Sequence, residues 1–91
     1  MFLRCTRAHF DPAKADEALT VAKDLNAALG RLPGLQHSHA ALDRAAGKSI
    51  TITIFDTREH AQFSRDALGD LVPRFQAVGL TMDAPEIYET I

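Results

Sequence analysis

Residues 49–55 read Ser-Ile-Thr-Ile-Thr-Ile-Phe, and this short run decides how the chain folds. Alternation with a period of two, in β-branched and aromatic residues, is typical of a β-strand. The isoleucines share one face of that strand, whereas Thr51, Thr53 and Phe55 share the other. Neither face carries a charge before Asp56, so the pattern indicates a strand that needs cover on both sides.

The chain before this strand predicts three further elements. Residues 2–10 predict a first strand, which Asp11-Pro12 ends, because both residues favour the start of a helix. Apolar residues then recur at spacings of three and four as far as Leu29, which predicts an amphipathic helix ending at Gly30. Residues 35–42 predict a second strand, joined to residues 49–55 by a polar hairpin in which Gly47 takes a positive φ.

The chain after this strand predicts a second helical region and a last strand. Asp56 with Glu59 resembles a capping box, although Thr57 could equally cap the helix that follows. That helix is expected to run to Leu68, to break or bend at Gly69-Asp70, and to continue as a second piece to Val78. Residues 85–91 predict the last strand.

The order β-α-β-β-α-β predicts the α+β class with a ferredoxin-like antiparallel sheet and helices on one face, as a single domain over residues 1–91. The helices cover one side of residues 49–55 and leave the other side open. A chain of 91 residues also buries a modest core. Packing of two sheets face to face in a homodimer would cover the open side.

Composition excludes several classes of protein. Hydrophobic residues make up 46% and charged residues 24%, which argues against disorder. A net charge of −2 argues against nucleic acid or an anionic membrane surface as a partner. Cys5 is the only cysteine, so no intrachain disulfide can form, and no apolar run suggests a signal peptide or a membrane span. A cytoplasmic location is the simplest interpretation.

The chain resembles the dimeric α+β-barrel superfamily, and within it the antibiotic-biosynthesis-monooxygenase-like domains. The resemblance rests on Pro33-Gly34, on Asp43-Arg44 with Gly47-Lys48, and on the run at residues 49–55 that continues into Thr57-Arg58-Glu59. It implies a homodimeric barrel, and in each protomer a pocket between sheet and helices for a small apolar or aromatic ligand.

The sequence departs from this group at several functional positions. Oxygenase members commonly have Trp where Phe55 stands, and this chain has no Trp. Haem-degrading members use an Asn on the first strand and a His within the second helix. Here the first strand has no Asn, and His60 falls in the opening turn of the helix.

Candidate functional residues are few. His37 and His39, two apart on a strand, could hold one metal ion with further ligands. Polar groups on an edge strand or at a subunit interface are the stronger interpretation, because no acidic residue accompanies them, so no metal site is expected. His60 could pair with Asp56 or Glu59. Six residues are candidates for the pocket: Arg7, His37, His39, Phe55, Phe63 and Tyr88.

Two functions stay open at this stage. One is a cofactor-independent monooxygenase acting on an aromatic or polyketide-like substrate, as the resemblance implies. The other is a non-catalytic dimeric module that binds a small molecule or a protein. A metal- or haem-dependent activity ranks third. No cofactor motif is present, and the sequence does not decide whether the chain is an enzyme.

Overall fold

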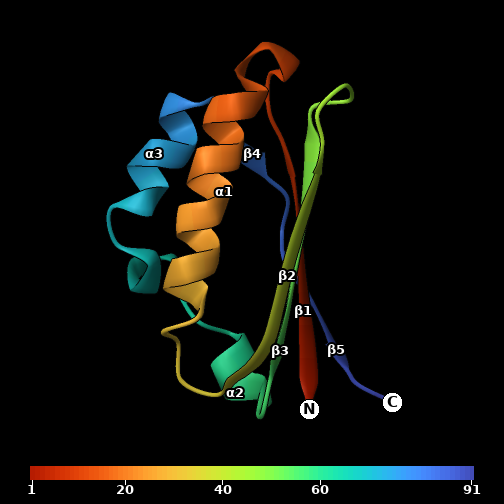
Figure 1. The fold of residues 1–91 in the computed structure, drawn as a ribbon. Helices are drawn as coiled ribbons and strands as arrows, with labels where there is room; N and C mark the ends of the chain where they lie inside the picture. The colour runs from red at the N-terminus through yellow and green to blue at the C-terminus, as the bar shows by residue number, and fades with distance from the viewer.

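The computed structural model describes the backbone of residues 1–91 and every side chain except that of Arg65. An antiparallel sheet has the strand order β2-β3-β1-β4, with β5 also paired to β1. The two main helices, α1 and α3, lie side by side on one face of this sheet, and the other face is open (Figure 1). The strands are β1 (Phe2–His9), β2 (Leu35–Asp43), β3 (Lys48–Phe55), β4 (Thr81–Met82) and β5 (Glu86–Glu89).

Helix α1 (Ala15–Leu29) confirms the predicted amphipathic helix. Asp11 accepts a hydrogen bond from the backbone N–H of Ala13 at 2.9 Å, and Pro12 begins a short 3₁₀ turn that leads into α1. The buried residues of α1 recur every three or four positions, and they pack mainly against α3 (Leu71–Ala77). The apolar core therefore lies largely between the two helices.

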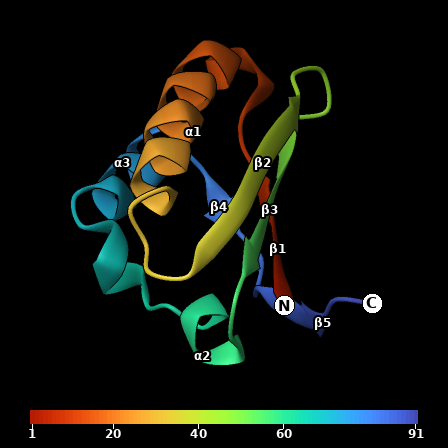
Figure 2. The same cartoon turned by 60° about the horizontal axis from the view of Figure 1, so that its bottom comes forward.

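The second helical region differs from its prediction. Helix α2 (Arg58–Ala61) is only one turn long, and a 3₁₀ turn (Arg65–Leu68) follows after a break. The expected helix through Phe63 was wrong because Arg4 donates to the carbonyl oxygen of Ala61 at 2.8 Å, the acceptor that a continuing helix would use. Thr57 is the cap of α2, and its hydroxyl accepts from the N–H of His60 at 3.1 Å. Both views place α2 at the end of the sheet where β1 begins (Figure 2).

The last strand also differs from its prediction, because two short strands replace one. Strand β4 pairs with Ala8 and His9 of β1, and β5 pairs with the other end of β1 from Phe2 to Cys5. Between them, the Asp83 N–H donates to the Arg7 carbonyl at 2.8 Å, and Pro85 has no N–H for the ladder. The chain therefore follows the edge of β1 in two segments.

The hairpin between β2 and β3 has the predicted geometry. Gly47 has a φ of 66°, and its N–H donates to the carbonyl of Asp43 at 3.0 Å. A β-carbon at this position would collide with the carbonyl oxygen of Phe10. Glycine is therefore required both by the backbone conformation and by the close approach of β1's end. Within the described part of the chain, none of the helices has the length and apolar character needed to cross a bilayer.

Candidate ligand cavity

Strand register divides the sheet into two chemically different faces. Residues directly opposite each other share a face, so Thr6, Thr51 and Ala40 form one cross-strand row and Cys5, Ile52 and His39 form another. The first row faces the helices and the second faces away. We call the second side the open face; its apolar side chains are those of Leu3, Cys5, Ala41, Ile50, Ile52 and Ile54.

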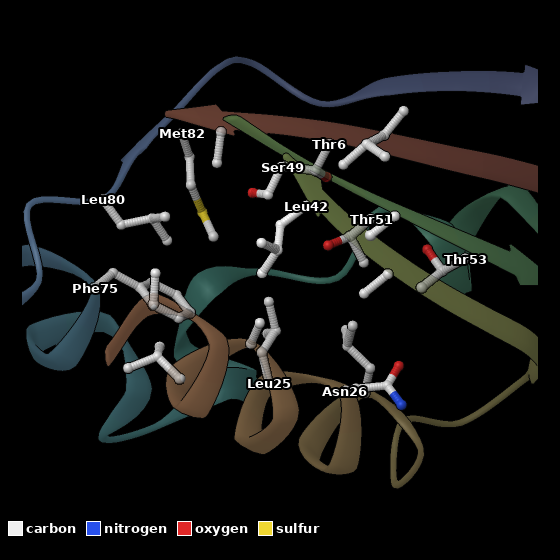
Figure 3. A pocket seen from close by; sticks show the side chains of 18 of the residues that line it. Thr6, Leu25, Asn26, Leu42, Ser49, Thr51, Thr53, Phe75, Leu80 and Met82 are labelled. Carbon is white, nitrogen blue, oxygen red and sulfur yellow. The ribbon is translucent and has the colours of Figure 1, made fainter. Parts of the chain in front are cut away.

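A cavity of about 380 Å³ lies between the helices and the sheet (Figure 3). Leu25 on α1, Phe75 on α3, and Leu80 and Met82 near β4 form its apolar wall. Four hydroxyl side chains form the opposite wall on the sheet: Thr6, Ser49, Thr51 and Thr53. The helix side of the cavity is therefore mainly apolar, and the sheet side carries the hydroxyl groups among apolar side chains such as Leu42 and Met82.

The hydroxyl groups differ in their hydrogen bonding. Thr53 is only 2% exposed, and its hydroxyl donates to the Arg4 carbonyl at 3.4 Å. The hydroxyls of Thr6, Ser49 and Thr51 make no hydrogen bond to any described residue. Thr6 lies directly opposite Thr51, and Ser49 lies two residues before Thr51 on the same face. These three hydroxyls can therefore bond to a molecule in the cavity.

Charged groups are scarce in the cavity wall. Among the described lining residues, only Arg4, Lys23 and Asp83 are ionisable. The Arg4 guanidinium is engaged, because it bonds the carbonyls of Ala61 and Phe63 and lies 4.1 Å from the Phe63 ring centroid. Asp83 lies 3.7 Å from the His9 imidazole, and Lys23 is exposed on α1. The described wall thus presents no paired acid and base to a ligand.

The six predicted pocket residues are divided by the sheet. Phe63 lines the cavity. Phe55 is completely buried behind it, with its ring centroid 5.8 Å from that of Phe63. The remaining four, Arg7, His37, His39 and Tyr88, lie on the open face and not on the cavity wall.

The open face carries a polar cluster of its own at one edge. Arg7 contacts Glu86 at 3.1 Å, and the Tyr88 hydroxyl donates to the same carboxylate oxygen at 3.0 Å. The bond to Glu86 raises the pKa of Tyr88, and it raises the pKa of Arg7 as well. His37 and His39 lie at the opposite edge, against Ile54 and Ile52. Among the described residues, no three potential ligands converge on a metal position.

His60 pairs with Asp56 away from the cavity. Its Nδ1 lies 2.6 Å from Asp56 Oδ1, and this hydrogen bond lowers the pKa of Asp56. Gly34, with a φ of 80°, fits against the pair, and a β-carbon there would collide with both side chains. The pair therefore links α2 to the end of β3, and the loop before β2 packs closely against it.

Sequence reasoning missed the hydroxyl wall, although one signal was available. Thr51 and Thr53 share a face of β3 with Phe55, a large aromatic residue of a type that is usually buried. The same alternation that buries Phe55 points these hydroxyls inward.

Comparison with known proteins bears on the fold. No protein-family model matches the sequence, and no curated protein is significantly similar to it. A protein from Deinococcus radiodurans, provisionally assigned as an antibiotic biosynthesis monooxygenase, matches with a TM-score of 0.80 at 12% identity, over 99% of this chain and 92% of that one. SnoaB, a cofactor-independent oxygenase from Streptomyces nogalater, matches with a TM-score of 0.67 at 16% identity, over 99% and 92%.

HapK from Hahella chejuensis matches with a TM-score of 0.77 at 15% identity, over 100% of this chain and 93% of that one. The chain therefore has the same fold as these three proteins. The predicted α+β, ferredoxin-like class and the resemblance to monooxygenase-like domains are confirmed. At these identities the likeness concerns the monooxygenase-like fold alone.

Proposed function

We propose that the chain is a homodimeric, cofactor-independent monooxygenase that takes an aromatic or polyketide-like molecule into the cavity. The observation that carries this proposal is the cavity of about 380 Å³ with an apolar wall of Leu25, Phe75 and Met82. Ligand sites have this size range and apolar character, with a few polar groups for orientation. The fold shared with SnoaB supports the choice of oxygenation.

The homodimer is supported by the open face. Ile50, Ile52 and Ile54 point away from the helices there, and all three are only partly buried within one protomer. Contiguous apolar surface on a soluble domain marks an interaction site, and a second copy presents a surface of the same kind. The dimer leaves the cavity accessible, because the cavity lies on the other side of the sheet.

The proposed oxygenation relies on the reactivity of the substrate itself. In oxygenation without a cofactor, a hydroquinone and O₂ give a hydroxyquinone and water, so the substrate supplies all the electrons. The described cavity wall offers no paired acid and base, so the substrate must react with O₂ without proton transfer to a protein base. The protein's part is to hold the ring and to exclude water.

Oxygen consumption with a panel of naphthalene and anthracene hydroquinones tests the activity. We expect O₂ uptake above autoxidation, with one atom of ¹⁸O from ¹⁸O₂ appearing in the product by mass spectrometry. Uptake that equals the protein-free rate across the panel would refute the oxygenase function.

A non-catalytic ligand-binding module is the second candidate. The absence of a paired acid and base among the described cavity residues favours it. It predicts an apolar small molecule that co-purifies with the chain in native mass spectrometry, together with no O₂ uptake. The lone buried thiol of Cys5 is consistent with a reducing cytoplasmic location for either function.

A further inference from the structure

We infer that the hydroxyls of Thr6, Ser49 and Thr51 select an uncharged aromatic ligand that carries two or more oxygen atoms along one edge. This inference rests on the proposed function, because it assumes that the cavity takes an aromatic ring system. It adds which part of the ligand is recognised and which residues recognise it.

The position of the three hydroxyls is the first argument. Thr6 and Thr51 are direct cross-strand partners in the middle of β1 and β3, and Ser49 follows on the same face. Neighbouring strands lie about 4.8 Å apart, and positions two apart on a strand lie about 6.5–7 Å apart. The hydroxyls therefore form a short L-shaped row on the sheet wall, with Thr51 at its corner, and the oxygen-bearing edge of a planar ring system can lie against it.

Their hydrogen bonding is the second argument. These hydroxyls have no bond to a described residue, whereas the neighbouring Thr53 and Ser38 bond the Arg4 carbonyl and Asn26. A hydroxyl can donate and accept, so the row suits phenol and carbonyl oxygens alike. Leu25 and Phe75 face this row across the cavity and can pack against the ring itself.

The lack of available charge beside the hydroxyls is the third argument. Arg4 bonds backbone carbonyls, and Asp83 faces His9 at 3.7 Å. Lys23, the third ionisable lining residue, is exposed on α1 and does not belong to the sheet wall that carries the hydroxyls. A carboxylate or sulfonate placed against three neutral hydroxyls would lose its hydration without gaining a counter-charge. The wall therefore favours neutral oxygen groups.

Two isomeric probes test the inference without turnover, under anaerobic conditions. Naphthalene-2,3-diol has both oxygens on one edge, naphthalene-2,6-diol has them at opposite ends, and naphthalene has none. We expect calorimetric titration to rank the affinities in that order. Naphthalene-2,3-dicarboxylate is expected to bind more weakly than naphthalene.

Variants then assign the selectivity to the row. Thr51→Val and Thr6→Val are each expected to lower the affinity for the 2,3-diol about fivefold and to leave that for naphthalene unchanged. Thr51→Ser keeps a hydroxyl and should keep the selectivity. Thr81→Val, an exposed position on β4 outside the cavity, is the matched control.

The outcomes separate this inference from the proposed function. If naphthalene binds but the two diols bind equally, or if Thr51→Val weakens all probes alike, the inference is overturned and the proposed function stands. If no aromatic probe binds to the folded protein, both the inference and the proposed function are refuted.

Discussion

On the face of the sheet that the helices cover, β3 presents Ser49, Thr51 and Thr53, whereas on its open face it presents isoleucines at positions 50, 52 and 54. A sheet with one solvated face ordinarily has the reverse pattern, with apolar residues inward and polar residues outward. The inversion is possible because α1 and α3 form much of the core between themselves. The covered face is therefore available for a ligand, and the open face for a second copy of the chain.

The largest effect is expected from a charge at the centre of the open face. Ile52→Arg would bury an unpaired guanidinium between two sheets, and it should weaken dimerisation by roughly a hundredfold or more. Sedimentation velocity measures the change. Thr20→Arg, on the exposed side of α1, is the control and should stay dimeric. A wild-type chain that is monomeric at micromolar concentration would contradict the assignment of the open face.

The second-largest effect is expected from truncating Phe55, at the well-packed end of the covered face. Phe55 is completely buried, so Phe55→Ala should lower the free energy of unfolding by about 3–5 kcal/mol. Urea denaturation measures this loss. The control is Phe2→Ala, because Phe2 is the cross-strand partner of Phe55 and is only partly buried. Equal losses in the two variants would mean that the covered face is not packed as described.

A smaller effect is expected when the cavity is filled. Ala22→Leu extends a side chain from α1 into the cavity, and it should weaken binding of naphthalene-2,3-diol at least tenfold. The free energy of unfolding should change by no more than about 1 kcal/mol, because the added methyl groups enter empty space. Ala27→Leu, on the exposed side of α1, should leave binding unchanged. Unaltered binding in Ala22→Leu would place the ligand elsewhere.

The smallest effect is expected from the Asp56–His60 pair, which lies away from the cavity. The hydrogen bond from His60 lowers the pKa of Asp56 in the folded protein below its ordinary 3.8, so the carboxylate stabilises the fold above that pH. This contribution is lost as the pH falls through the lowered pKa. The stability difference between wild type and Asp56→Asn should therefore shrink as the pH falls through the lowered pKa of Asp56 and should vanish in strong acid.

Urea denaturation over a pH series measures this difference, with the exposed Asp70→Asn as the control. A difference between wild type and Asp56→Asn that is independent of pH down to strong acid would contradict the role of the carboxylate.

Local patterns sufficed for β3, α1 and the hairpin at Gly47, because each is specified by residues that are neighbours in sequence. They failed after Ala61, where the helix ends through a bond from Arg4 on a distant strand. They also failed at β4, whose two residues pair with β1 and carry no pattern of their own. These elements depend on contacts between segments that sequence spacing does not reveal.

The candidate site was harder to predict for a related reason. Arg7, His37, His39 and Tyr88 were selected because their side chains are reactive or polar, and all four lie on the open face. The cavity wall consists mainly of apolar side chains with threonine and serine, and these residue types have no distinctive signature in a sequence. Strand alternation predicts which residues share a face of the sheet. Which of the two faces is covered depends on the packing of α1 and α3, which the alternation does not reveal.

Tyr88 has a practical consequence. The chain has one tyrosine and no tryptophan, so its near-ultraviolet absorption and intrinsic emission come almost entirely from this side chain. Tyr88 is 54% exposed and belongs to the open face, beside Leu3 and Glu86. The native protein thus carries an optical probe on the surface that we propose for the second copy, and dissociation of the proposed dimer can be followed spectroscopically without a label.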